Sequence, residues 1–127
     1  MVDEENSAYL DLYVEEAANL LKAFSESLEI LKKNPEDKSN LEIAGRAMHT
    51  FASNSGFMGF GNISRLARNM EYFFDFLKKK NSPPTQEMLS TLTEYLGVIN
   101  KWFANVKQNA VEPEVDSLIA ELEILKK

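Results

Sequence analysis

Apolar residues recur every three or four positions along almost the whole of this 127-residue chain. Such spacing places them on one face of an α-helix, and no stretch shows the two-residue alternation of a β-strand. The pattern is interrupted where proline, glycine or lysine gather, in KKNPED (32–37), GFMG (56–59), KKKNSPP (78–84) and NAVEPE (109–114). The sequence therefore predicts helices over about residues 6–33, 37–55, 62–80, 85–108 and 114–126, with Asn62 as the N-cap of the third.

The short connections between these helices restrict how they can pack. Helices joined by a few residues run antiparallel to their neighbours. We therefore expect an all-α fold, an antiparallel up-down four-helix bundle with a fifth C-terminal helix packed against it. The length suits a single domain over residues 1–127. Within the fourth helix we expect Phe103 to face the core and its neighbour Trp102 to be partly exposed.

Charge and composition exclude several classes of partner. The net charge of −6 argues against nucleic acid and against an anionic membrane surface, since both are bound through lysine and arginine. No apolar run approaches the ~20 residues that a membrane span needs. The first residues also lack the basic and apolar character of a signal peptide. With no cysteine in the chain, disulfides and thiolate chemistry are excluded, and we expect a cytoplasmic domain.

His49 is the only histidine in the chain. On a helix its surface neighbours are the residues three and four positions away, which are Gly45, Arg46, Ala52 and Ser53. Three of these four are small, so a reactive group of another protein could reach the ring directly. A di-iron bundle enzyme would need a second histidine and is excluded. A single histidine on a helix is more often an ordinary surface residue, and these neighbours alone favour that interpretation.

Residues 47–74, AMHTFASNSGFMGFGNISRLARNMEYFF, resemble the histidine phosphotransfer (HPt) motif. The similarity extends to the histidine core GRAMHT (45–50), the turn GFMGF (56–60) and the opening helix LYVEEAANLLKAFSESLEILKKNPED (12–37). These stretches are most similar to the N-terminal phosphoacceptor domain of chemotaxis histidine kinases of the CheA type. The resemblance covers nearly all of the chain.

This resemblance implies a role in two-component signalling. His49 would take a phosphoryl group on Nε2 from ATP, delivered by a histidine kinase catalytic domain, and pass it to an aspartate of a response-regulator receiver domain. Glu71 would accept the Nδ1–H of the ring and orient it, and Arg68 would stabilise the phosphoryl group. The partners would dock on a surface formed by Gly45, Arg46, Ala52, Ser53 and Gly56. The resemblance implies no cofactor and no metal, and a relay that is not catalytic alone.

Two features leave alternatives open. The family has lysine and glycine after the histidine, where this chain has Ala52 and Ser53. The missing lysine favours a degenerate module that docks a kinase or receiver without being phosphorylated, whereas the retained His49 and Glu71 favour an active phosphoacceptor. Glu71 could also be an ordinary solvated carboxylate paired with Arg68. If positive charge at position 52 is what is lacking, Ala52→Lys should speed phosphoryl transfer.

Overall fold

Helices make up most of residues 4–127, the part of the chain that this computed structural model describes. They are α1 (Glu4–Lys33), α2 (Lys38–Phe57), α3 (Gly61–Lys80), α4 (Gln86–Phe103), the short 3-10 helix η1 (Val106–Gln108) and α5 (Asp116–Leu125). No strand occurs in this part of the chain, so the predicted all-α class is confirmed. Among the same residues, no helix combines the length and the apolar character needed to cross a membrane.

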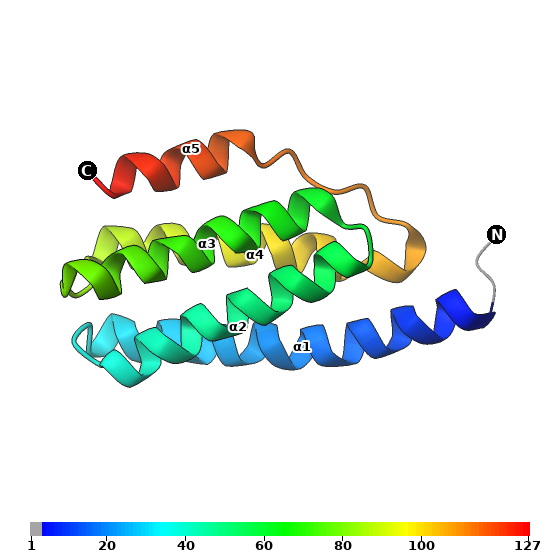
Figure 1. Cartoon of the computed structure of the whole chain (residues 1–127), viewed down its shortest axis with the longest axis horizontal. Coiled ribbons are helices and arrows are strands. Elements are labelled where there is room, and N and C mark those ends of the chain that lie inside the picture. The colour runs from blue at the N-terminus through cyan, green and yellow to red at the C-terminus, as the bar shows by residue number, and fades with distance from the viewer. Residues whose placement is uncertain (1–3) are drawn as a thin grey trace.

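The four longer helices lie alongside one another along the length of the molecule (Figure 1). The chain reverses direction between α1 and α2, between α2 and α3, and between α3 and α4. α2 packs most extensively against α3 and α1, and α1 also contacts α4. After η1 an extended segment leads into α5, which returns along α3. Because α2 and α3 are joined by a short turn, residues far apart in sequence face each other across these two helices.

A cluster of buried apolar side chains fills the space between the helices. Aromatic rings are among its largest fully buried members, and Phe24 of α1 meets Phe74 of α3 edge to face with 5.8 Å between ring centroids. Burying such a side chain contributes roughly 1.5–3 kcal/mol relative to leaving it exposed. The apolar faces therefore fix the rotation of each helix about its own axis, and hence which residues of α2 and α3 face solvent.

The ends of α2 and α4 are among the helix ends that differ from the predicted ones. α2 continues through Gly56 to Phe57, and the chain turns at Gly59, where a φ of +87° suits a residue without a Cβ. α4 ends at Phe103 rather than at residue 108, because the chain passes there into a turn and then into η1. Gly56 and Phe57 therefore belong to the last turn of α2, whereas residues 104–108 do not continue the inward face of α4.

The start of α3 is capped by a distant part of the chain. Its N-cap position is Phe60, not Asn62 as predicted, and the Phe60 side chain makes no capping hydrogen bond. Instead, the backbone N–H of Ile63 donates to the Glu112 carboxylate at 2.9 Å. The Asn62 side-chain amide donates to the carbonyl of Pro113 at 3.0 Å. The segment before α5 thus ties down the first turn of the helix that faces α2.

Trp102 is buried, contrary to the expectation that it would be partly exposed, and Phe103 is only half-buried. The inward face of α4 runs through Tyr95, Ile99 and Trp102, at spacings of four and three residues. The Trp102 ring packs edge to face against Phe60, with 4.9 Å between centroids. Phe103, the last residue of α4, is partly buried and packs against the same core, with 6.5 Å between its ring centroid and that of Tyr13.

Candidate functional site

His49 lies on the exposed face of α2, opposite Glu71 of α3. Its ring Nδ1 is 2.7 Å from Glu71 Oε2. The His49 side chain is 57% exposed to solvent, whereas the Glu71 side chain is 15% exposed. With its proton on Nδ1, the ring donates to the carboxylate, and the lone pair on Nε2 is available to an electrophile. The arrangement presents an oriented imidazole to another molecule.

The turn between α2 and α3 brings these two residues to nearly the same level. His49 lies eight residues before the last residue of α2, and Glu71 lies ten residues after the first residue of α3. At about 1.5 Å per residue the offset is about 3 Å, which a glutamate side chain can span. Glu71 also lies between the buried Met70 and the exposed Tyr72, so its carboxylate is covered without being in the core.

Arg68 holds the Glu71 carboxylate from its other side. Its Nη1 donates to Glu71 Oε1 at 2.9 Å, and its Nη2 donates to Ser53 Oγ at 3.2 Å. Arg68 Nη1 also lies 3.2 Å from His49 Nδ1. When Nδ1 donates its proton to Glu71, it cannot also accept a hydrogen bond from Arg68. The contact between Arg68 and the ring then brings a positive charge close to the imidazole without a hydrogen bond. Glu71 is therefore more than a carboxylate paired with Arg68, because its second oxygen meets the histidine.

One of the five residues expected to form the docking surface lies in the core. The other four, at or near the surface of α2, are Gly45, Arg46, Ser53 and Gly56. Ala52 is 0% exposed and belongs to the core cluster, so the expectation that it touches a partner is wrong. The physical reason is its place on the side of α2 that packs against α3, where the Ala52 carbonyl accepts a hydrogen bond from Ser64 Oγ at 2.8 Å.

Two glycines allow α2 and α3 to approach closely on either side of His49. A Cβ at Gly45 would lie 3.2 Å from Phe74 Cβ, and a Cβ at Gly56 would lie 3.0 Å from Ser64 Oγ. The first contact is tighter than ordinary packing, and its partner atom is fixed to the backbone of α3. The small residues before and after His49 therefore do more than leave the ring open, because they keep the two helices close together.

A hollow of about 190 Å³ lies beside His49. Leu41, Glu42, Gly45, Arg46 and His49 line it from α2, and Glu71, Asp75 and Lys78 line it from α3. Glu42 binds both cations of the hollow, Lys78 Nζ at 2.8 Å and Arg46 Nη2 at 3.3 Å. The sequence interpretation missed Glu42 and Lys78. Their spacing of seven residues from His49 and from Glu71 is that of one helix face, and this signal could have identified them.

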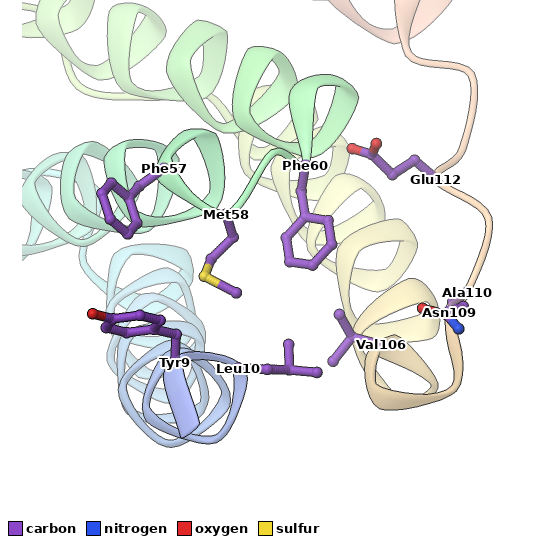
Figure 2. A pocket seen from close by; sticks show the side chains of 9 residues that line it. All are labelled: Tyr9, Leu10, Phe57, Met58, Phe60, Val106, Asn109, Ala110 and Glu112. Atoms are coloured by element: carbon purple, nitrogen blue, oxygen red, sulfur yellow. The ribbon is translucent and has the colours of Figure 1, made fainter. Parts of the chain in front are cut away.

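A separate cavity of about 690 Å³ opens at the end of the bundle where α2 turns into α3 (Figure 2). Met58 and Phe60 point into it from this turn, facing Leu10 of α1 and Val106 of η1. His49 is not among its lining residues, so the cavity is distinct from the site described above. Among the side chains that the structure describes, those of residues 7–127, no group of three histidine or acidic residues is arranged to hold a metal ion.

Comparison with known proteins points to one family. A family model described as the Hpt domain matches residues 8–123. The chain is 29% identical over 119 residues to the chemotaxis protein CheA of Listeria monocytogenes, which covers 91% of this chain and 19% of that protein. It is 30% identical over 88 residues to CheA of Bacillus subtilis, covering 69% of this chain and 13% of that protein. It is 25% identical over 104 residues to CheA of Borreliella burgdorferi, covering 82% of this chain and 12% of that protein. The chain thus aligns with less than a fifth of the length of these relatives. No solved structure gives a significant match.

Proposed function

The chain belongs to the Hpt domain family, and from this premise we propose that His49 accepts a phosphoryl group and passes it to an aspartate of a receiver domain. Family membership and the CheA relatives support a phosphotransfer module of two-component signalling. The observation that carries the finer proposal is the 2.7 Å contact between His49 Nδ1 and Glu71 Oε2 under an exposed ring. The proposal treats residues 1–127 as one domain, an antiparallel up-down four-helix bundle with α5 packed against it.

The proposed step forms one bond and breaks one bond. The lone pair of His49 Nε2 attacks the γ-phosphorus of ATP, and ADP leaves with the electron pair of the broken P–O bond. The proton on Nδ1 stays in its hydrogen bond to Glu71, whose negative charge stabilises the positive charge that develops on the ring. Arg68 keeps Glu71 in place, and its charge attracts the phosphoryl group. In the second transfer, a carboxylate oxygen of the receiver attacks phosphorus and the Nε2–P bond breaks.

The partners in this proposal are a histidine kinase catalytic domain and a response-regulator receiver domain. Each must bring its reacting atom onto His49, so each would cover the exposed face of α2 from Arg46 to Gly56. The chain aligns with less than a fifth of its CheA relatives, and the proposal holds whether the kinase domain lies in the same polypeptide or in another. We place the module in the cytoplasm, because ATP is the phosphoryl source.

Labelling with ATP and a CheA-type kinase core tests this assignment. We expect label that is stable in base and labile in acid, which is the behaviour of phosphohistidine. The variant His49→Gln should carry no label, and its circular dichroism spectrum should match that of the wild type. Added receiver domain should remove the label from the wild type, whereas a receiver with asparagine at its acceptor position should leave it in place. Label that persists in His49→Gln would exclude His49 as the acceptor.

One observation favours a second function. Position 52, where the family has lysine, holds a buried alanine that supplies no charge. In this alternative the bundle docks a kinase or a receiver without carrying phosphate. The same experiment separates the two functions, since wild-type protein that binds a receiver but takes up no label from the kinase would support the docking module.

A further inference from the structure

We propose that Arg46 and Lys78 form a pair of cations, in addition to Arg68, that binds the phosphoryl group on His49, and that Glu42 holds this pair while the histidine is unphosphorylated. The inference rests on the proposed function of His49. In this inference the hollow between α2 and α3 holds the oxygens of the phosphoryl group, a dianion bonded to His49 Nε2.

Arg68, the cation already described at the site, is bound on the Nδ1 side of the His49 ring. Arg68 Nη1 binds Glu71 at 2.9 Å, and Nη2 binds Ser53 at 3.2 Å. Arg68 is therefore held on the Nδ1 side of His49, and its charge attracts the phosphoryl group on Nε2 only from across the ring. Position 52 supplies no charge, because its residue is alanine. Further positive charge for the phosphoryl oxygens must come from other residues.

The hollow beside His49 contains two other cations. Arg46 lies one turn before His49 on α2, and Lys78 faces it from α3. Side chains on an α-helix lean toward its N-terminus, so the His49 ring leans toward Gly45 and Arg46. Gly45 lines this part of the hollow with its backbone alone, and the position of its missing Cβ faces Phe74. The volume of about 190 Å³ leaves room for a phosphoryl group between the two helices.

Glu42 binds both of these cations in the unphosphorylated protein. Lys78 Nζ lies 2.8 Å from one Glu42 oxygen, and Arg46 Nη2 lies 3.3 Å from the other. The pKa of the Glu42 carboxyl is lowered, chiefly by the hydrogen bond from Lys78, and the pKa of Lys78 is raised, chiefly by the same contact. Glu42 and Lys78 are therefore both charged at neutral pH.

A phosphoryl group competes well with Glu42 for these cations. It carries close to two negative charges at neutral pH and three acceptor oxygens, whereas the carboxylate carries one charge. The three side chains are between 44% and 75% exposed, so an exchange of partners disturbs no core packing. The other acidic groups facing the hollow are Glu71, which is bound to His49 and Arg68, and Asp75. Phosphorylation should therefore move Arg46 and Lys78 from Glu42 to the phosphoryl oxygens.

Labelling by phosphoramidate tests this inference without any kinase. In this reaction Nε2 bonds to phosphorus as the P–N bond of the reagent breaks, and ammonia leaves after taking a proton from solvent. We expect the rate to fall roughly two- to five-fold in Lys78→Met and in Arg46→Gln, and to rise by a similar factor in Glu42→Gln, as for exposed charge pairs. Lys79→Met and Glu26→Gln make the same changes of charge at exposed positions outside the hollow, and they should label at the wild-type rate.

The phosphorus-31 resonance of the phosphorylated protein gives a second measurement. Cations on the phosphoryl oxygens lower the pH at which the group takes up its next proton, so the titration midpoint should rise in Lys78→Met and Arg46→Gln. Rates and midpoints that equal those of the two control variants would overturn the inference. Wild-type protein that takes up no label, or His49→Gln protein that is labelled, would instead overturn the proposed function of His49. The two failures are therefore distinguishable.

Discussion

At the scale of single residues, the site depends on each of the two oxygens of Glu71 having a different partner. Oε2 meets Nδ1 of His49 at 2.7 Å, and Oε1 accepts a hydrogen bond from Arg68 at 2.9 Å. Arg68 in turn binds Ser53 on the opposite helix. The carboxylate is thus held by groups from α2 and α3 together, and it selects the ring tautomer whose Nε2 lone pair is free.

The variant Glu71→Gln tests whether the Glu71 carboxylate orients His49 in this way. It keeps the size of the side chain but removes the charge that faces the ring, so labelling by phosphoramidate should slow by roughly ten-fold or more, the effect of losing a charge-assisted hydrogen bond. The urea midpoint of unfolding should change little, because the side chain lies outside the core. Glu87→Gln on α4 is the matched control and should label normally. An unchanged rate in Glu71→Gln would remove Glu71 from the mechanism.

The burial of Ala52 adds an effect on stability to the expected effect of Ala52→Lys. Position 52 is 0% exposed and packs in the core, so a lysine there must displace its neighbours to bring its ammonium group to the surface. We expect the free energy of unfolding to fall by roughly 2–4 kcal/mol, measured by urea denaturation. Ala120→Lys, at an exposed position of α5, should have little effect. If Ala52→Lys instead kept wild-type stability, its side chain would reach the surface without displacing its neighbours.

At the scale of secondary-structure elements, α2 and α3 work as a pair whose geometry other segments support. Gly45 and Gly56 let the two helices approach, and the turn at Gly59 sets their relative offset. The first turn of α3 lacks a local side-chain cap and uses the carboxylate of Glu112, 49 residues away from Ile63. The segment between η1 and α5 therefore helps to fix the helix that carries the partner of the histidine.

We predict that Glu112→Ala lowers the free energy of unfolding by about 1 kcal/mol, the usual effect of removing a helix N-terminal cap. Urea denaturation measures this loss, and amide hydrogen exchange at Ile63 should become faster because its N–H loses an acceptor. Glu114→Ala, two residues further along and exposed, should leave both quantities unchanged. Equal effects of the two variants would show that the Glu112 hydrogen bond does not stabilise α3.

At the scale of the whole molecule, buried tyrosines connect neighbouring helices and make stability depend on alkaline pH. Tyr13 of α1 shares a 2.7 Å hydrogen bond with Ser55 of α2. Tyr95 of α4 lies 2.9 Å from both the Leu118 carbonyl and the Glu121 carboxylate of α5. Burial raises the pKa of Tyr13 to about 12. Burial also raises the pKa of Tyr95, and the hydrogen bond to Glu121 adds to that effect.

From these shifts we expect stability to decline as the pH rises from about 10 toward 12. In that window the unfolded chain has lost the phenolic protons of Tyr13 and Tyr95, whereas the folded protein retains these two protons. The folded state then binds more protons, so the free energy of unfolding falls with pH. Thermal melting at a series of alkaline pH values measures the decline. Tyr13→Phe should reduce its steepness, although the variant is less stable at neutral pH because Ser55 loses its partner. A decline of equal steepness in both proteins would exclude Tyr13 as a cause.

The sequence by itself determined the all-helical class and the approximate helices, because apolar spacing is a local property that needs no knowledge of neighbours. It also singled out His49, Glu71 and Arg68 through a motif, and these three side chains meet in the structure. No local pattern could show that the cap of α3 comes from Glu112, since that contact joins residues 49 positions apart.

Only the tertiary structure decided where the edges of the apolar faces lie. It placed Ala52 in the core, and it brought Glu42 and Lys78, whose helical spacing already puts them on the faces of His49 and Glu71, into one hollow. It also turned Trp102 inward. The rotation of each helix and the distance to its neighbour follow from packing summed over several elements. A residue at the edge of an apolar face is therefore assigned to the core or to the surface only when all the helices are in place.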